Sequence, residues 1–276
     1  MYTIGVVILH YKNRYETEKC VESYLKQDCK RVTAKIVIVD NGSQNGTGKM
    51  LQEKYKKSNS IYVLVLDKNL GFAQGNNTGM RFLMTKCIPD FVVYSNSDIE
   101  LINDQFYHWI ITDYEKFNFA VLGPDIYSTT KRFHQSPTPN FSYRRAIERK
   151  YFNFPLYMRI RDKLFPTKID YTGISSQYTL HGALLVFSER FFKIYPDGIY
   201  DKTFLYLEEA FLRKYCDKAG LPMIYDGTYK VYHVQAASTD NDWSLEKEKQ
   251  RLRENRFNES LNLYLKLSKT ECGRKH

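Results

Sequence analysis

The sequence predicts an α/β protein with a mostly parallel central sheet flanked by helices. Short apolar runs of strand length alternate, through the first 125 residues, with segments in which apolar residues recur at helical spacing. Strands that alternate with helices are joined by right-handed crossovers, which place neighbouring strands parallel. With 276 residues, 43 % hydrophobic and 26 % charged, the composition is that of a folded chain with a large buried core.

The predicted elements follow this alternation from the first strand onward. Strands are expected at residues 4–9, 36–40, 61–66, 91–94 and 120–122. Helices are expected at 14–27, 47–57, 73–86 and 103–117. The alternation stops between residues 128 and 178, where prolines punctuate a basic and aromatic excursion. It resumes with strands at 180–187 and 229–234, a helix at 204–219, and a charged helix at 244–269 with an apolar stripe of Leu252, Phe257, Leu261, Tyr264 and Leu265.

Three features bear on where the protein resides. No run of about 18 apolar residues is present, which argues against a transmembrane helix. The first residues, Met1 to Leu9, read as a strand rather than as a signal peptide. Five scattered cysteines without a C-x-x-C pair favour thiols in a reducing compartment. We therefore expect a cytoplasmic protein.

Positive charge is concentrated in one stretch of the chain. Lysine and arginine exceed the acids by 41 to 31, a formal charge of +10. Residues 131–170 hold ten basic and three acidic residues, and so carry +7 of that total. Such a balance favours a polyanionic partner, either nucleic acid, anionic lipid or a phosphorylated substrate. The aromatic residues in the stretch suit an anionic membrane surface, and a solvated basic surface is the alternative: Tyr143, Tyr151, Phe152, Phe154, Tyr157 and Phe165.

Polar side chains follow the predicted strands at the points where the strands end. Asp40 closes the second strand, and Asn96-Ser97-Asp98 closes the fourth. Between them, a glycine-rich turn at 69–79 opens a helix, where free N–H groups favour an anion. Ligands of open parallel sheets bind beyond the carboxyl ends of the strands. The turn lacks both the G-x-G-x-x-G spacing and the Walker lysine, so it is neither a Rossmann fingerprint nor a P-loop.

Two acids and a histidine in the second half are further candidates. Glu208 and Glu209 are adjacent, and adjacent residues on a helix point about 100° apart, so one can face a cleft while the other pairs or caps. Apolar surroundings would raise a carboxyl pKa and suit a general base, whereas the alternative is a pair of acids favoured by the helix dipole. His233 ends a strand, where it is either structural or a ligand for a divalent metal or a phosphate.

In their order along the chain, these motifs resemble the family 2 glycosyltransferases, which have the GT-A fold, and most resemble the bacterial rhamnosyltransferase-like and capsule-building branch. The resemblance implies that the nucleotide sugar is bound by Leu9, His10, Tyr11, Asp40, Asn41, Gly71, Gly75, Asn76, Asn96, Ser97 and Asp98. It implies acceptor-side positions at Gly182 and Ala183, a Mg²⁺ or Mn²⁺ ion held by Asp98 and His233, and a catalytic base at Glu209 or else Glu208. This chain departs from the family at Asn96, which replaces the first aspartate of D-x-D, and in its Glu-Glu pair, which replaces Glu-Asp.

The resemblance also implies an organisation and a reaction. One GT-A domain would span residues 1–276, with a nucleotide-binding half at 1–125, an acceptor-side half at 126–240 and a C-terminal helix at 241–276. The reaction would transfer a sugar, with rhamnose as one candidate, from a dTDP- or UDP-linked donor and would invert the anomeric configuration. The acceptor would be a saccharide or a lipid-linked saccharide in cell-surface polysaccharide synthesis. The protein would be cytoplasmic, with peripheral binding to the inner face of the membrane through 131–170.

Two other classes compete with this interpretation. A sugar-phosphate nucleotidyltransferase would open on a glycine-rich turn, but His10 to Arg14 contains no glycine. A nucleic-acid-binding protein would explain the charge but not the acids at the strand ends, which repel phosphate unless a metal intervenes. We therefore expect no nucleic-acid partner, and the sequence leaves the oligomeric state open.

Overall fold

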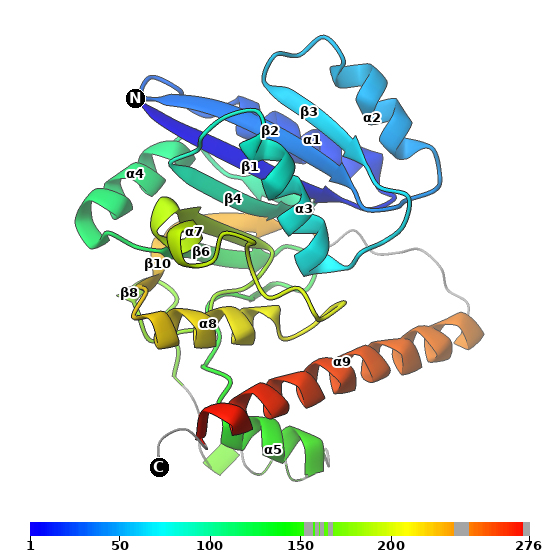
Figure 1. Ribbon diagram of the computed structural model, residues 1–276, viewed down its shortest axis with the longest axis vertical. Coiled ribbons are helices and arrows are strands. Elements are labelled where there is room, and N and C mark those ends of the chain that lie inside the picture. Colours follow the sequence, from blue (N-terminus) through cyan, green and yellow to red (C-terminus); the bar gives the residue numbers. More distant parts are fainter. Residues whose placement is uncertain (152–156, 158–159, 161–162, 165–167, 235–242, 273–276) are drawn as a thin grey trace.

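The computed structural model describes residues 1–151, 157, 160, 163–164, 168–234 and 243–272. Its centre is one sheet with the strand order β3-β2-β1-β4-β9-β6-β10-β5, onto which β7 and β8 pair at the side (Figure 1). The predicted α/β class is therefore confirmed. The arrangement of the strands divides into a parallel half and a mixed half.

The parallel half follows the predicted alternation closely. The strands β1 (Tyr2–His10), β2 (Val32–Asp40), β3 (Ile61–Val65) and β4 (Phe91–Asn96) pair parallel to one another. The helices are α1 (Arg14–Leu25), α2 (Thr47–Tyr55), α3 (Phe72–Met84) and α4 (Phe106–Phe117). These strands and helices lie close to their predicted ranges, because the apolar runs of the strands and the helical spacing of the apolar residues are both strong in this half.

The second half of the sheet is mixed. β9 (Leu184–Ser188) lies antiparallel between β4 and β6 (Val121–Ser128), and β6 pairs parallel with β10 (Met223–His233). A short strand that the sequence did not predict, β5 (Ile99–Leu101), pairs antiparallel with β10. β9 follows the excursion rather than a helical crossover, so it enters the sheet from the opposite end. The smaller elements are β7 (Phe133–His134), β8 (Ile174–Ser175) and α7 (Glu189–Ile194).

Both faces of the sheet are covered by apolar layers. In β1, Val6 and Ile8 face a core shared with α1 and α4, while Val7 faces a second core shared with α3, α7 and α8 (Glu208–Ala219). Successive side chains of a strand point to opposite faces, so burial on both faces gives the continuous apolar run in the sequence.

A third apolar cluster attaches the excursion to the rest of the molecule. α9 (Trp243–Cys272) runs between α8 and α5 (Tyr143–Tyr151) (Figure 1). Ala146 of α5, Phe211 of α8 and Leu261 of α9 share this cluster. The predicted stripe on α9 is confirmed at Leu261, Tyr264 and Leu265 but is wrong at Leu252, which is 48 % exposed.

Three further findings bear on the expectations about the surroundings of the protein. No helix in the described ranges is long and apolar enough to cross a membrane. Cys20, Cys29, Cys87 and Cys216 are free thiols. Of the aromatic residues assigned to a membrane surface, Phe152, Phe154 and Phe165 lie outside the described residues, while Tyr151 is 62 % exposed.

Candidate active site

The carboxyl ends of β1, β2 and β4 meet at one edge of the sheet. His10 is paired with Asp40 across β1 and β2, and Leu9 with Asn96 across β1 and β4. The ends of β1 and β2 and the Asn96 segment are thereby placed side by side, as the alternation of the sequence predicted. Tyr11, the residue after β1, is 44 % exposed at this edge.

The side chain of His10 has a structural position that the sequence did not predict. It is fully buried, with Nδ1 2.6 Å from the Thr17 hydroxyl of α1 and Nε2 2.9 Å from the Thr47 hydroxyl of α2. Burial lowers its pKa, against the opposing effect of the Asp40 carboxylate. The imidazole therefore links α1 to α2 through its two ring nitrogens, and the contribution of His10 to nucleotide-sugar binding stays a prediction.

Asp40 and Asn41 shape the turns that line this edge. Asp40 is buried and accepts a hydrogen bond from the Ser43 N–H at 3.0 Å. Asn41 donates to the Gly71 carbonyl at 3.0 Å and accepts from the Leu70 N–H at 2.9 Å. Both side chains thus hold the loops in position, and the contact of Asp40 with a nucleotide base stays a prediction.

The glycine-rich turn brings the two halves of the chain together. Phe72, at the start of α3, donates its N–H to the Phe204 carbonyl at 3.0 Å. A Cβ on Gly71 would lie 2.1 Å from that carbonyl oxygen, and one on Gly75 would lie 2.6 Å from Leu9 Cδ1, so both positions require close approach. Asn76 is buried and donates to the Phe72 carbonyl at 3.0 Å, inside the first turn of the helix.

Asp98 faces His233 just beyond β4. The distance from Asp98 Oδ1 to His233 Nε2 is 3.1 Å, and the Val234 N–H donates to the Asp98 carbonyl at 2.9 Å. His233 Nδ1 lies 2.7 Å from the amide oxygen of Gln135, so Nδ1 carries a proton. Asn96 and Ser97 are half-buried beside this pair. The structure therefore brings together the two residues that were predicted to hold a metal.

Glu209 is joined to the same region through the start of β9. Its Oε1 accepts from the Gly182 N–H at 3.0 Å, and the Ala183 carbonyl accepts from the Asn96 N–H at 2.8 Å. His181 lies between the two acids, with its ring centroid 6.2 Å from that of His233. Burial lowers the pKa of His181, His233 lowers it further, and Glu209 and Asp98 both raise it. Asp98 and Glu209 therefore lie on the same side of the molecule, and both are close enough to His181 to influence its pKa.

Glu208 lies in a different environment from its neighbour. The side chain is 5 % exposed and accepts from the Thr203 hydroxyl at 3.1 Å. Burial, reinforced by the Glu209 carboxylate, raises the pKa of Glu208 to about 7. The helix starts at Glu208 rather than at the predicted residue 204, because Tyr206 and Leu207 have positive φ angles of 82° and 67°. Glu208 and Glu209 are then the first two residues of α8, and their adjacency on the helix points the two carboxylates apart.

A cavity of about 330 Å³ opens beside Glu209. Its walls come from the segment after β7, from α5, from the approach to β9 and from the start of α8: Thr138, Pro139, Phe141, Arg145, Arg149, Thr179, Leu180, His181, Leu207, Glu209 and Ala210. Glu208 and Asp98 are not part of this lining. A molecule in the cavity would therefore contact Glu209 and His181 but not Asp98 or Glu208.

Sequence reasoning missed several residues of this region. His181 directly precedes the Gly182-Ala183 pair and was not singled out, although a histidine next to a strand start is a visible signal. Gln135 and Thr203 gave no signal, and only folding brings Gln135 to His233, which is 98 residues further along the chain. The excursion was recognised as basic, but its lining of a cavity was not predicted.

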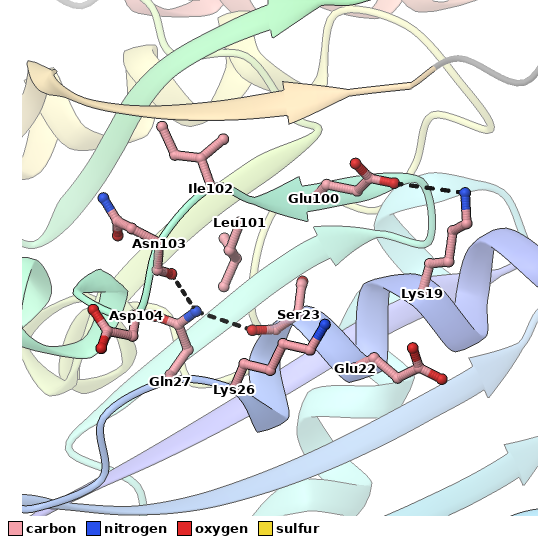
Figure 2. Close-up of a pocket in the computed structure, with 10 residues that line it drawn as sticks. All are labelled: Lys19, Glu22, Ser23, Lys26, Gln27, Glu100, Leu101, Ile102, Asn103 and Asp104. Atoms are coloured by element: carbon pink, nitrogen blue, oxygen red, sulfur yellow. Dashed lines mark hydrogen bonds and ion pairs between the residues drawn. The ribbon is translucent and has the colours of Figure 1, made fainter.

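A second depression contains none of these residues in its lining and lies between α1, β5 and the segment that follows β5 (Figure 2). Gln27 donates to the carbonyls of Ser23 and Asn103 at 2.9 and 2.7 Å and accepts from the Phe106 N–H at 2.8 Å. Lys19 pairs with Glu100 at 3.9 Å across the opening. These contacts attach α1 to the start of α4, which indicates a structural role.

Known proteins resemble this chain in sequence and in structure. A model of glycosyl transferase family 2 matches residues 5–177. Two relatives come from Haloferax volcanii. The low-salt glycan biosynthesis hexosyltransferase Agl10 is 24 % identical in sequence, over 52 % of this chain and 43 % of its own length. The glycosyltransferase AglE is 26 % identical in sequence, over 28 % of this chain and 26 % of its own length.

Solved structures of S. aureus TarS 1–349 have a similar fold. The complex with UDP-GlcNAc matches with a TM-score of 0.57 and 16 % sequence identity, and the match covers 86 % of this chain and 59 % of that chain. The complex with UDP matches with a TM-score of 0.57 and 15 % sequence identity, and the match covers 85 % of this chain and 61 % of that chain. This chain spans less than two-thirds of the length of each of these relatives. The likeness to TarS shows a GT-A-like α/β fold with a mixed central sheet. Because the family model matches more than half of its residues, the chain belongs to glycosyl transferase family 2.

Proposed function

We propose that the protein transfers a sugar from a nucleoside-diphosphate sugar to an acceptor hydroxyl, with inversion at the anomeric carbon. The observation that carries this proposal is the placement of Asp98 and Glu209 on one side of the molecule. Asp98 faces His233, while Glu209 accepts from the Gly182 N–H, and the carbonyl of the next residue, Ala183, accepts from the Asn96 N–H. The acids have separate surroundings, so one can serve the leaving group while the other serves the nucleophile. Two facts support a nucleotide donor: one relative is named as a hexosyltransferase, and TarS has been solved with UDP-GlcNAc.

The residues at Asp98 fit a divalent cation that the donor completes. Mg²⁺ commonly takes one or two carboxylates together with substrate phosphates and binds its ligands at about 2.1 Å. Asp98 Oδ1 and His233 Nε2 lie 3.1 Å apart, so both atoms could contribute to one such site. The contact of His233 Nδ1 with Gln135 fixes the ring so that Nε2 faces Asp98. No cluster of three or more acidic, histidine or cysteine ligands occurs within the described ranges, so the diphosphate would supply the other oxygens.

The bound Mg²⁺ or Mn²⁺ would neutralise the charge that develops on the diphosphate. On the other side, Glu209 accepts the proton of the acceptor hydroxyl while that oxygen bonds to the anomeric carbon. The bond between the anomeric carbon and the diphosphate oxygen breaks, and its electron pair leaves with the diphosphate. Glu209 is the better base of the pair because it borders the cavity, whereas Glu208 is buried against Thr203.

The biological setting is proposed as follows. The donor is UDP- or dTDP-linked, with rhamnose as one candidate sugar, and the acceptor is a saccharide or lipid-linked saccharide of a surface polysaccharide such as a capsule. The chain acts as one domain, with a nucleotide-binding half at 1–125 and an acceptor-side half at 126–240. The cytoplasmic face of the membrane is the proposed site of action, since the segment 131–170 carries +7 of formal charge.

A nucleotide-binding experiment tests the donor side. Thermal shift is measured with UDP, dTDP and GDP, each with and without Mn²⁺. We expect one nucleotide to raise the melting temperature in a metal-dependent manner, and Asp98→Asn to abolish the metal-dependent part. Asp104→Asn is the matched control, because Asp104 is an exposed aspartate further along the same segment. Stabilisation by oligonucleotides alone, without a response to any nucleoside diphosphate, would overturn the proposal.

A further inference from the structure

His181 lies where the surroundings of Asp98 and of Glu209 meet. It directly precedes Gly182, whose N–H donates to Glu209 at 3.0 Å, and it lines the cavity beside that acid. Its ring centroid lies 6.2 Å from that of His233, which faces Asp98. Burial lowers the pKa of the His181 ring, while Glu209 and Asp98 both act to raise it. The ring is therefore close to the two acids that the proposed reaction uses.

The hydrogen bond of the His181 ring determines which of its nitrogens carries the proton. Nδ1 accepts a hydrogen bond from the Ala183 N–H at 3.1 Å. A ring nitrogen that accepts from a backbone N–H carries no proton, so the ring is neutral and its proton is on Nε2. Within the ranges that the structure describes, no protein group accepts a hydrogen bond from this Nε2–H. His181 therefore offers one donor to a ligand.

The backbone on both sides of His181 is held by the sheet and its core. Leu180 is 1 % exposed and packs in the apolar cluster that α3, α7 and α8 share. On the other side, the Ala183 carbonyl accepts from the Asn96 N–H at 2.8 Å. A donor that is fixed in this way suits a specific contact with a ligand, because little conformational freedom remains to be lost on binding.

The proposed reaction places the transferred sugar between the two acids. In an in-line displacement, the leaving oxygen lies on the Asp98 side and the attacking hydroxyl on the Glu209 side, so the sugar that bears the anomeric carbon lies between them. A carboxylate can only accept hydrogen bonds, whereas the neutral ring of His181 donates one from Nε2. The hydroxyl oxygens of a sugar are neutral acceptors that match such a donor.

We propose that His181 recognises the transferred sugar by donating a hydrogen bond from Nε2 to one of its hydroxyl oxygens. This inference rests on the proposed function, because it takes Asp98 as the side of the diphosphate and Glu209 as the base. It assigns to His181 a part in the choice of the donor sugar, separate from the binding of the nucleotide.

Binding constants for a nucleotide sugar and for its nucleoside diphosphate distinguish these two contributions. Isothermal titration calorimetry with Mn²⁺ gives the Kd of UDP and UDP-glucose, and of dTDP, dTDP-glucose and dTDP-rhamnose. His181→Leu removes the donor, so it should weaken binding of the nucleotide sugar by about five- to tenfold and leave the Kd of the matching diphosphate within about twofold. His181→Gln has an amide N–H near the place of Nε2 and should bind the nucleotide sugar within about threefold of the wild type.

The control and the contrary outcomes use the same measurement. His108→Leu is the matched control, since His108 is an exposed histidine on α4, and it should change neither constant. Equal weakening of both ligands by His181→Leu would overturn the inference, as would two unchanged constants. A wild type that binds no nucleotide sugar and no diphosphate would overturn the proposed function as well. Metal-dependent binding of a diphosphate together with an unaffected His181→Leu variant would leave the proposed function standing.

Nitrogen-15 NMR of the histidine rings provides a second measurement, which does not depend on the folding of His181→Leu. The chain has six histidines, and the signals of His181 are those that are lost in His181→Gln. We expect an unprotonated Nδ1 and a protonated Nε2 in the free protein. With Mg²⁺ present, the Nε2 signal should change more with the nucleotide sugar than with its diphosphate. A proton on Nδ1, or an equal change with both ligands, would contradict the inference.

Discussion

Glu208 and Glu209 are neighbours in the chain, yet their environments differ. Glu209 is half-buried beside the cavity and is oriented by the Gly182 N–H, while Glu208 is enclosed and bonded to Thr203. A general base must reach the proton that it removes, and an enclosed carboxyl cannot do so without the helix start moving. The position of the cavity, more than the chemistry of the two side chains, distinguishes their roles.

The first prediction concerns this pair. Glu209→Gln should lower the rate of sugar transfer by about 10²–10⁴-fold, because the amide cannot accept the hydroxyl proton. Glu208→Gln should lose less than about tenfold, because the amide still accepts a bond from Thr203. The measurement is the rate of nucleoside-diphosphate release under saturating donor. Equal losses in the two variants would contradict the assignment of the base.

The second prediction concerns the glycine that starts α3. Gly71 has a φ of 83° and a ψ of −173°, a region open essentially to glycine alone, and a Cβ there would meet the Phe204 carbonyl. Gly71→Ala should therefore lower the free energy of unfolding by about 3 kcal/mol or more. Gly46→Ala is the control: its φ is also 83°, but a Cβ meets nothing within 4 Å, so the cost should stay near about 1 kcal/mol. Urea unfolding curves give both values, and similar costs would mean that the contact with Phe204 is unimportant.

At the scale of elements, α4 is attached to β10 through a buried pair of carboxyl groups. Asp226 accepts from the Trp109 indole N–H at 2.7 Å and from the Thr228 N–H at 2.8 Å. Burial, together with the charge of Asp226, raises the pKa of Asp113 to about 7. The native state therefore holds a proton on Asp113 at pH values where the unfolded chain has already released it.

The third prediction follows from the sign of that shift. The native pKa of Asp113 lies above the unfolded value of 3.8, so the stability that this group contributes is complete below about pH 4 and is lost as the pH rises to about 7. Asp113→Asn should remove that dependence and raise the free energy of unfolding by about 1–2 kcal/mol at pH 8. Asp197→Asn, at an exposed site, should leave the dependence unchanged. Urea unfolding at a series of pH values measures the slope, and a wild-type slope in the Asp113 variant would exclude this pair as its source.

At the scale of the whole molecule, α9 packs against both α5 and α8 and thereby fixes the position of α5. Its contacts are concentrated near Leu261, Tyr264 and Leu265, and the Tyr264 ring packs on Phe211 of α8 with centroids 5.3 Å apart. The cavity wall that α5 contributes depends on this packing. The strand ends contribute no residue to the apolar cluster that α9 forms. Loss of the packing around α9 should therefore affect the cavity beside Glu209 more than the strand ends.

The fourth prediction tests this separation. Leu261→Ala removes a buried side chain and should cost about 2–4 kcal/mol of stability. Amide hydrogen exchange should increase first in α5 and α9, while the metal-dependent response to nucleotide is retained. Leu252→Ala, at a position that is 48 % exposed, should change stability by less than about 0.5 kcal/mol. Loss of nucleotide binding in the Leu261 variant under folding conditions would show that the two sides are coupled.

Strong periodicity made the first half predictable. The runs around Ile8, Val37 and Val93 are apolar on both faces, and the helices between them are amphipathic, so local pattern and global packing agree. Short β5 was not predicted because three residues carry no measurable period, and the antiparallel direction of β9 was not predicted because no helix precedes it. The contacts of the His10 ring were not predicted because its two threonine partners lie on separate helices.

The sequence by itself determined the fold class, the positions of the parallel strands along the chain and the family, since these follow from local periodicity and from motifs that are contiguous in the chain. Tertiary structure alone decided that Glu209 rather than Glu208 borders a cavity and that Arg145 and Arg149 line it. It also set the 3.1 Å distance between Asp98 and His233, whose shared site the family resemblance had implied. These contacts join residues up to about 135 positions apart, as between Asp98 and His233. Chain separation of this size leaves no local pattern, because only the packing of the sheet and its helices sets the distances.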